Sequence, residues 1–461
     1  MIPFLKSHIC RALYPLFEGK QPLLLAYSAG VDSQALFHLL LEIKARTPFE
    51  LHVAHVDHCW RETSSREAQS LKQAVELLKI PFHLITLNRS DTPEGDKENY
   101  YRKKRLEAFS QIYQHINAAC LLMAHHQDDL AETVFKRLFE GAFLFKLAGL
   151  KQETYLGGMK VIRPLLGCEK KHLRDYLTIR KIDHIEDETN QDTTYLRAKQ
   201  RLKIFPQIQS MFGKNATKNL ARLSEKIGEL DSYLQMQTLK YQDAITTGPF
   251  GLCCDFSKQS YQKVEWEYVI KSILERFGIF LSGVCLDDLL EKLSQGASCK
   301  KFLAKTCDIF VDRGLFFVHP QLKKQNFPNK IMWNGTATSF ESEDFVWELE
   351  PSLGSEISSS WKDLYIGEVL LDLENGEYDL INTLADREAM ERTYTNQKVP
   401  AFLRALAPAF AKKEQLICNP WIKTSKKLKE KKVVKLICTA KSGESLNFNG
   451  LKSTPLLSLK S

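Results

Sequence analysis

Apolar residues follow two different spacings in the first two hundred residues of the chain. Short continuous apolar runs, which are typical of buried strands, lie at Leu23–Tyr27, Leu51–Val56, Phe82–Leu87 and Cys120–Ala124. Between these runs the apolar residues recur at helical spacing, over Gln34–Arg46, Ser64–Lys79 and Lys97–Gln114 and again after Asp128. Strands that alternate with helices predict an α/β fold, in which a doubly wound parallel sheet carries helices on both faces.

The pattern changes after Pro206, where long helix-like segments replace the alternation. They lie at Ala216–Leu239, Trp266–Phe277 and Cys285–Leu293, and a hairpin-like piece follows at Asp308–Val318. Residues 323–360 are rich in Asn, Ser and Glu, and the last hundred residues have a mixed pattern. We therefore expect four parts: a doubly wound domain over 1–210, a mainly helical domain over 211–322, a connector over 323–372 and a small mixed α+β domain over 373–461.

The length and composition are those of a globular protein with several domains, because 461 residues are too many for one core. The net charge of +8 and the pI near 8.7 are consistent with a polyanionic partner, although many soluble proteins carry a similar charge. The eleven cysteines form no Cys-x-x-Cys pair, which argues against a zinc knuckle or a redox pair and fits a reducing cytoplasm. No apolar stretch approaches the ~20 residues of a membrane helix. We expect a soluble cytoplasmic protein with no membrane partner.

The strand at Leu23–Tyr27 ends in a small-residue loop, and a helix pattern starts directly after it. The loop residues are Ser28, Ala29, Gly30, Val31, Asp32 and Ser33. A helix N-terminus behind small residues presents unpaired N–H groups to an anion, so the loop predicts a phosphate site. No Gly-Lys-Ser/Thr follows, which distinguishes it from a Walker A loop. Because a carboxylate tolerates nearby phosphates only with a bridging cation, we expect Asp32 to bind Mg²⁺ and the loop to bind ATP.

Two polar clusters follow other strands of the predicted sheet, at the edge where ligands of parallel sheets bind. Asp57 and His58 come after the second strand, either as rim residues beside the nucleotide or as a plain polar loop. The run from His125 to Thr133 follows the fourth strand. It predicts either an acid-rich helix cap or a general base or second Mg²⁺ contact. A zinc site is disfavoured because no His-Glu-x-x-His spacing occurs.

Three basic clusters have two interpretations each. Glu98, Arg102 and Arg105 share a helix face, which is either solvated or suited to grip phosphate through its arginines. Residues 186–201 begin acidic and end basic, either as a helix with ends matched to its dipole or as a ligand-lining loop with Arg197 and Arg201 facing phosphate or nucleic acid. Residues 423–435 contain seven lysines, which form either a solvated face or an RNA contact.

These clusters, in this order, resemble the motifs of the tRNA(Ile)-lysidine synthetase family within the PP-loop ATP pyrophosphatases. The loop at 28–33 is similar to the family's Ser-Gly-Gly-x-Asp-Ser. The other matching segments are Asp57-His58 with Arg61, Glu98 with Arg102 and Arg105, His125–Thr133, Arg163–Leu166, Asp187–Asp192 with Arg197, and Val399–Pro408. Apart from the last, they span Leu23 to Arg201. Their combination is highly specific, although each segment alone is weak.

Three positions depart from the family pattern. Ala29 replaces the second glycine of the loop, which a small side chain tolerates if its φ stays negative. Ala198 stands where Asn usually follows Arg197, and Glu140 stands where an arginine is common. Each of the last two departures bears on one contact to phosphate or RNA.

The resemblance implies a two-step ligation. ATP adenylates the C2 oxygen of the wobble cytidine in tRNA(Ile) with a CAU anticodon and releases pyrophosphate, and the amine of free L-lysine then displaces AMP. The implied catalytic residues are Asp129, as the leading general base, His125, Arg102 and Arg105. The loop at 28–33 with Asp57 and His58 would bind ATP, and Asp32 would bind Mg²⁺. The residues implied to contact tRNA or lysine are Glu98, Asp128, Glu132, Asp187, Asn190, Arg197, Arg201, Lys426 and Lys427.

The resemblance also implies that the parts at 211–322 and 373–461 bind tRNA, and it leaves open whether the chain forms a homodimer. Other functions compete with this one. A PP-loop tRNA thiolase would activate the base in the same way, but it depends on reactive or cluster-binding cysteines, and no Cys-x-x-Cys occurs. A small-molecule ligase of the superfamily would need shorter and less basic appended domains. A non-catalytic nucleotide- and RNA-binding protein would bind ATP without RNA-dependent release of pyrophosphate.

Overall fold

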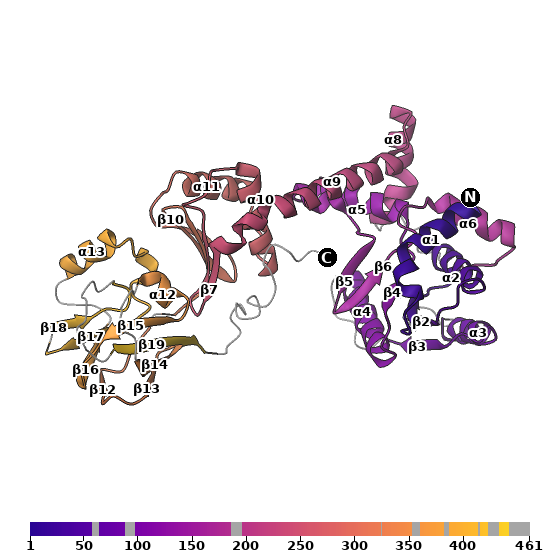
Figure 1. Cartoon of the computed structure of the whole chain (residues 1–461). Helices are drawn as coiled ribbons and strands as arrows, with labels where there is room; N and C mark the ends of the chain where they lie inside the picture. Colours follow the sequence, from indigo (N-terminus) through magenta and orange to yellow (C-terminus); the bar gives the residue numbers. More distant parts are fainter. Residues whose placement is uncertain are drawn as a thin grey trace. The chain divides into compact units, whose positions relative to one another are not determined.

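The computed structural model describes residues 1–57, 64–87, 97–185, 196–323, 325–352, 360–381, 387–413, 415–422 and 433–441. The chain divides into two compact units, and the boundary lies between Tyr233 and Leu234, inside helix α9 (Ala216–Thr238). Figure 1 shows the elements of both units along the chain. Within the described residues, no helix is long and apolar enough to cross a membrane.

A six-stranded sheet forms the centre of the first unit, with the strand order β3–β2–β1–β4–β6–β5. The strands are β1 (Leu23–Ala26), β2 (Leu51–Asp57), β3 (Phe82–Thr86), β4 (Cys120–Leu122), β5 (Glu153–Leu156) and β6 (Met159–Ile162). All neighbouring strands are parallel except β5 and β6. The predicted parallel sheet is therefore confirmed. The apolar pattern does not predict the β5–β6 hairpin, because β5 has no buried residue.

Helices cover both faces of this sheet. They are α1 (Ile2–Phe17), α2 (Val31–Lys44), α3 (Ser64–Glu76), α4 (Lys97–His115), α5 (Gln127–Phe139) and α6 (Lys170–Arg180). Leu23 and Leu25 of β1 belong to one apolar cluster with α1, α2 and α6, whereas Leu24 belongs to another with Ala108 and Phe109 of α4. The central strand is apolar throughout because it is covered on both faces. This arrangement is the doubly wound fold that the sequence predicts.

After α6 the chain continues as one nearly continuous helix with a wide turn in its middle. The helix consists of α7 (Leu196–Lys199), the π-helical turn η4 (Gln200–Ile204) and α8 (Phe205–Phe212). Gly213 ends α8 with a φ of 61°, and the side chain of Asn215 accepts a hydrogen bond from the Lys218 amide at the start of α9. The first part of α9 packs on the 3₁₀ turn η2 (Leu144–Ala148), since Ser224 Oγ donates to the Ala148 carbonyl.

A five-stranded antiparallel sheet opens the second unit. Its strands are β7 (Ile245–Gly248), β8 (Gly251–Asp255), β11 (Leu315–Pro320), β10 (Cys307–Asp312) and β9 (Lys300–Leu303), in this spatial order. The helices α10 (Lys263–Arg276) and α11 (Gly283–Ser294) pack on it, and the turn η5 (Leu239–Ala244) precedes it. The expected helices and the β10–β11 hairpin occur. The other three strands are an addition to the mainly helical part expected here, because they have only four or five residues each.

Two four-stranded sheets complete the second unit. One has the order β12 (Lys330–Trp333), β16 (Gly376–Ile381), β17 (Ala409–Lys412) and β18 (Gln415–Cys418). The other has the order β13 (Thr338–Glu341), β14 (Phe345–Ser352), β19 (Val433–Ala440) and β15 (Glu368–Asp372). The remaining elements are α12 (Trp361–Tyr365), α13 (Arg387–Asn396) and the turn η6 (Ala401–Leu403).

The segment expected to be a connector, 323–372, contributes strands to both of these sheets. β12 pairs with β16, and β14 pairs with β19 along its whole length. One apolar cluster contains Phe250 of the β7–β8 turn and Phe317 of β11 together with Trp347 and Trp421. The three parts that the sequence separates after 211 therefore share a core. Our proposed boundaries at 322 and 372 fall inside this core, because the pairing of distant strands leaves no local signal.

Candidate active site at the carboxyl ends of the parallel strands

The loop between β1 and α2 has the geometry of an anion cradle. The Ser28 amide donates to Ser33 Oγ at 3.2 Å, and Ser33 Oγ lies 3.2 Å from the Gly30 carbonyl. The Ile185 amide donates to the Ala29 carbonyl at 3.0 Å, which fixes the loop from outside. Gly30 is the N-cap of α2 and supplies no side chain, so no side-chain oxygen occupies the first N–H groups of the helix. These N–H groups are free to bind phosphate.

Ala29 corrects one expectation from the sequence. Its φ is 60°, in the left-handed region, whereas we expected an alanine there to keep a negative φ. Gly30, by contrast, has a φ of −70° and a ψ of 166°, which any residue adopts. The loop therefore needs a left-handed residue at position 29, and Ala29 adopts this conformation at a cost of about 1 kcal/mol.

Asp32 lies in the first turn of α2 and faces two cationic groups. Its Oδ2 lies 3.4 Å from His126 Nε2 and 3.5 Å from Lys170 Nζ. Burial alone would raise the pKa of the Asp32 carboxyl, but the hydrogen bond and charge of His126 and the charge of Lys170 lower it below its usual range. Its other oxygen, Oδ1, is buried and has no hydrogen-bond partner among the residues that the structure describes. An orphaned carboxylate oxygen beside a phosphate cradle fits a divalent cation.

The described residues contain no group of three or more His, Cys, Asp and Glu side chains placed to hold a metal ion on their own.

His126 is a fully buried N-cap of α5, surrounded by three carboxylates. Its Nε2 lies 3.4 Å from both Asp32 Oδ2 and Asp129 Oδ2. Its Nδ1 lies 3.2 Å from the Asp128 amide and 3.5 Å from Asp128 Oδ2, so a neutral ring accepts from the amide and a protonated ring donates to the carboxylate. Burial lowers the pKa of His126, but the carboxylates outweigh burial and raise it to about 9. The ring is therefore an imidazolium at neutral pH.

Asp128 joins two helices at the site. Its Oδ2 accepts a hydrogen bond of 2.9 Å from the Lys170 amide, which is the first N–H of α6. Burial would raise the pKa of Asp128, but the hydrogen bonds from His126 and Lys170 lower it to about 2. Asp128 thus holds the N-termini of α5 and α6 together as a permanent carboxylate.

Arg201 binds the next two carboxylates on α5, which belong to Asp129 and Glu132. Its Nη2 donates to Asp129 Oδ1 at 2.9 Å and to Glu132 Oε2 at 3.1 Å, and its Nε donates to Glu132 Oε1. The second oxygen of Asp129 accepts from the His126 amide at 3.0 Å. Burial raises the pKa of Glu132, and Arg201 opposes this effect. In this state Arg201 faces carboxylates, and both oxygens of Asp129 are engaged.

His125 is held by an arginine that our list of site residues omitted. Arg163 Nε donates to His125 Nδ1 at 3.3 Å, and Arg163 Nη1 donates to the Lys151 carbonyl at 2.8 Å. Burial lowers the pKa of His125, and the charges of Arg163 and Arg197 lower it further. The charge of Asp129 opposes these effects, and the resulting pKa is about 4. Because Nδ1 accepts from Arg163 and the ring is neutral, its proton is on Nε2.

Arginines from four parts of the fold lie within electrostatic range of one another, and two of them, Arg163 and Arg197, act on His125. Arg102 and Arg105 lie on α4, Arg137 on α5, Arg163 after β6 and Arg197 on α7. Burial and the charges of Arg102 and Arg197 lower the pKa of Arg105, and burial and Arg102 lower the pKa of Arg163 to about 10. Where the structure describes the chain, Arg102, Arg105 and Arg197 have no carboxylate partner. Uncompensated guanidinium groups of this kind are suited to bind phosphate.

The remaining predicted residues divide into two groups. Asp57 is buried at the end of β2, where its Oδ2 accepts from Ser65 Oγ at 3.3 Å, and Val31 is buried in the first turn of α2. The positions that lie outside the described residues are His58, Arg61, Asp187, Asn190, Lys426, Lys427 and the side chain of Glu98.

Sequence reasoning missed Lys170 and Arg137, and it noted Arg163 only as part of the matching segment Arg163–Leu166, without a role at the site. Arg163 follows β6, whose carboxyl end lies at the same edge of the sheet as those of β1 and β4. The rule that ligands bind at this edge would have identified it, had β6 been recognised as a strand of the sheet. Lys170 and Arg137 leave no such signal, since they reach the site only through the packing of α5 and α6.

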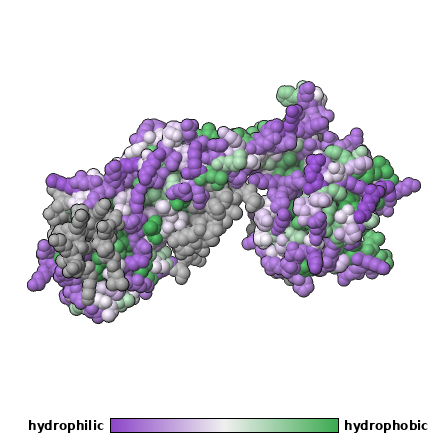
Figure 2. Space-filling view, viewed as in Figure 1, coloured by the Kyte–Doolittle hydropathy of each residue, from purple (hydrophilic) through white to green (hydrophobic). Residues whose placement is uncertain are grey.

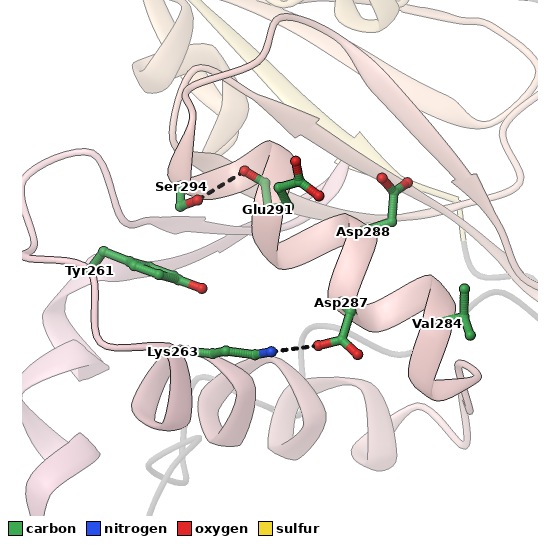
Figure 3. Close-up of a pocket in the computed structure, with 7 residues that line it drawn as sticks. All are labelled: Tyr261, Lys263, Val284, Asp287, Asp288, Glu291 and Ser294. Atoms are coloured by element: carbon green, nitrogen blue, oxygen red, sulfur yellow. Dashed lines mark hydrogen bonds and ion pairs between the residues drawn. The ribbon is translucent and has the colours of Figure 1, made fainter.

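The second unit has a groove of about 560 Å³ along α11 that contains none of the predicted residues (Figure 3). It is lined by Asp287, Asp288 and Glu291, with Tyr261 and Lys263 at the start of α10. Lys263 Nζ lies 2.8 Å from Asp287 Oδ1. Its acidic lining is unsuited to phosphate.

Comparisons with known proteins show which family the chain resembles. Residues 5–208 match the sequence model of the PP-loop domain. The tRNA(Ile)-lysidine synthase of Protochlamydia amoebophila is 29% identical over 410 residues, which cover 87% of this chain and 89% of that protein. Among solved structures, the U34-tRNA thiolase NcsA from Methanococcus maripaludis has a TM-score of 0.43 and 16% identity, and covers 50% of this chain and 80% of its own. The tRNA(Ile)-lysidine synthase of Chlamydia pneumoniae is 34% identical over 305 residues, which cover 65% of this chain and 93% of that protein. The chain belongs to the tRNA(Ile)-lysidine synthase family.

Proposed function

We propose that this protein ligates free L-lysine to C2 of the wobble cytidine in tRNA(Ile) with a CAU anticodon, at the expense of ATP. The first step transfers AMP to the C2 oxygen and releases pyrophosphate. In the second step the lysine ε-amine attacks C2 and AMP leaves with that oxygen. The observation that carries the proposal is the contact between the phosphate cradle and the His125–His126 segment, near arginines that have no carboxylate partner in the described part of the chain.

The adenylation step needs positive charge where negative charge develops. The free N–H groups of α2 would hold the triphosphate, and Asp32 Oδ1 would hold Mg²⁺, which neutralises the pyrophosphate as it leaves. Arg102, Arg105 and Arg197 would stabilise the charge on the α-phosphate. His125 would donate a hydrogen bond through Nε2–H, because its Nδ1 is already occupied by Arg163.

The lysine step needs carboxylates for an ammonium group and a base for its proton. Asp129 and Glu132 would supply the carboxylates, and in this structure the Arg201 guanidinium occupies them. We therefore infer that Arg201 leaves these carboxylates for a phosphate when the substrates bind and that lysine takes its place. Asp129 is our candidate for the general base, since release of Arg201 would free its Oδ1 to accept the proton.

A test of this function uses the full chain, ATP, Mg²⁺, radiolabelled lysine and an unmodified CAU tRNA(Ile) transcript. We expect one lysine to become RNA-bound for each AMP and pyrophosphate released. The same transcript with another anticodon should take up no label. Pyrophosphate release without RNA-bound lysine would contradict the proposal, and so would ATP binding without any RNA-dependent turnover.

A thiolase reaction is less compatible with the described cysteines. Burial raises the pKa of Cys120 and of Cys168 to about 12, so neither thiol of this sheet region is a nucleophile at neutral pH. If the protein transferred sulfur from a thiol donor to the transcript in the assay above, the ligase proposal would be wrong.

A further inference from the structure

Residues 196–224, which we call the basic helical segment, are one of two segments of the chain in which positive charge is concentrated, the other being the lysines at 423–435. Seven of the 64 Lys and Arg residues lie in the basic helical segment, and none of the 56 Asp and Glu residues does. The rest of the chain therefore has 57 basic and 56 acidic residues and is nearly neutral overall. A charge asymmetry of this size marks a surface for a polyanion.

The basic helical segment is ordered structure. It comprises α7, η4, α8 and the start of α9, and its one turn is fixed by Gly213 and by the side chain of Asn215. The fixed turn holds the cations on either side of it at defined positions on the surface. A surface of this kind binds with less loss of conformational entropy than a flexible charged tail.

Apart from Arg201, the cations of the segment are exposed and form no ion pair within the described part of the chain. Among the described residues, no carboxylate forms an ion pair with the five that lie away from the site, which are Lys199, Lys203, Lys214, Lys218 and Arg222. Other exposed lysines of the chain do have carboxylate partners, as in the pairs Lys226–Glu229 at 2.8 Å and Lys240–Glu265 at 2.7 Å. The positively charged side chains of the segment therefore repel one another, and a bound polyanion would relieve this repulsion.

The segment is continuous with the active site. Its first residues include Arg197, whose charge acts on Arg105 and His125, and Arg201, which binds Asp129 and Glu132. From Arg197 the helix extends about 25 Å to the end of α8, at 1.5 Å per residue. Figure 2 shows a mainly hydrophilic surface over α8. At its end, Met211 and Phe212 are 79% and 70% exposed.

We propose that the basic helical segment is a docking surface for the phosphate backbone of the RNA substrate, and that Met211 and Phe212 contact an unpaired base at its outer end. The proposal rests on the proposed function, because an RNA whose reacting base lies at His125 must leave the site along some face of the protein. Cations that begin at the site and continue outward provide such a face. Exposed apolar side chains beside phosphate-binding cations are a usual platform for single-stranded bases.

The test compares two triple variants of the full chain that remove the same charge. One carries Lys203→Gln, Lys214→Gln and Lys218→Gln, in the segment. The control carries Lys226→Gln, Lys240→Gln and Lys263→Gln, whose side chains already pair with acids. Equal Tm values for both variants and the wild type show that any difference lies in binding. Affinity for the CAU transcript is measured from 0.05 to 0.3 M salt, together with KM and kcat.

We expect the segment variant to bind the transcript about tenfold more weakly at 0.15 M salt, with a salt slope smaller by about 2 to 3. Its KM for RNA should rise while kcat at saturating RNA stays unchanged, because these lysines lie away from the reacting atoms. The control should resemble the wild type. Phe212→Ala should weaken RNA binding without changing the salt slope.

Equal RNA affinity of the two triple variants would overturn this inference and leave the proposed function intact. A segment variant that lost binding to phosphatidylserine vesicles but not to RNA would also overturn it, in favour of a membrane surface. A wild-type protein that bound ATP but no transcript would contradict the proposed function itself, and the inference with it.

Discussion

At the residue scale, the β1–α2 loop stores backbone strain at Ala29. Its φ of 60° places Cβ close to the following carbonyl, which costs about 1 kcal/mol. The substitution Ala29→Gly removes this cost but gives the unfolded chain more freedom, so we expect a net gain of about 0.5 kcal/mol in the free energy of unfolding. Thermal unfolding followed by circular dichroism should show a Tm higher by about 1–2 °C. A lower Tm would mean that the left-handed conformation is not strained.

The neighbouring glycine provides a contrast with the opposite outcome. A Cβ at Gly30 would meet Ser28 Oγ at 3.6 Å and the Ile185 carbonyl at 3.9 Å, which are ordinary contacts. Gly30→Ala should therefore leave the Tm unchanged. The methyl group would nevertheless lie beside the free N–H groups of α2, so we expect ATP to bind about tenfold more weakly in titration calorimetry, or about 1.4 kcal/mol. Unchanged ATP affinity would remove the loop from the nucleotide site.

Arg163 controls the protonation of His125 in the same region. Burial, together with the charge of Arg163 and its hydrogen bond to Nδ1, disfavours the imidazolium and keeps the pKa of His125 near 4. Arg163→Gln should raise this pKa, so that His125 gains a proton at a higher pH than in the wild type. We expect the acid limb of RNA-dependent pyrophosphate release to move to higher pH by about one unit. Arg137→Gln is the matched control, because no hydrogen bond joins Arg137 to His125; an equal shift in both variants would contradict the role.

At the element scale, the N-terminus of α5 depends on a charged histidine. The groups that face His126 are Asp32 of α2, Asp128 and Asp129 of α5 itself and, through Asp32, Lys170 of α6. The pKa of His126 is raised to about 9 from an ordinary value of 6.5. The stabilisation from its charge is fully present below pH 6.5 and disappears as the pH rises through 9.

We therefore expect the first unit to lose on the order of 2 to 3 kcal/mol of stability between pH 6.5 and pH 9.5. Urea unfolding of the wild type at these two pH values measures the loss. His126→Gln, which keeps a polar cap without a titrating ring, should be less stable at pH 6.5 and should show little of this pH dependence. A variant with the same pH dependence as the wild type would assign the effect to other groups.

Elements that are local in sequence could be predicted, and those made by distant pairing could not. The β1–α2 junction was visible because the apolar run, the small loop and the helix start lie within twenty consecutive residues. The orientation of Arg201 could not be predicted, because it depends on the π-helical turn η4 and on a hydrogen bond to the buried Glu132. Arg201 and Glu132 are 69 residues apart in the sequence. Similarly, β14 and β19 pair over about ninety intervening residues, and neither run alone identifies its partner.

At the scale of the whole molecule, the second unit has one core that is built from all its parts. Phe250 of the β7–β8 turn, Trp347 of β14 and Trp421 after β18 are each fully buried in the same cluster. β12 and β14 have their partners, β16 and β19, only after residue 372. The first unit, in contrast, has its own two apolar clusters around β1. We therefore expect the chain to tolerate truncation after residue 233 but not after residue 372.

We expect a fragment of residues 1–233 to be soluble, to unfold cooperatively and to bind ATP. A longer fragment, 1–372, should aggregate, because it leaves β12 without its partner β16 and β14 without β19, and exposes a core that the missing strands would cover. Size-exclusion chromatography and thermal unfolding of the two fragments measure this difference. The comparison is informative because chain length alone predicts that the longer fragment, 1–372, is the more stable of the two. A monomeric and cooperatively folded 1–372 fragment would show instead that the segment before residue 372 forms a core of its own, as the sequence pattern suggests.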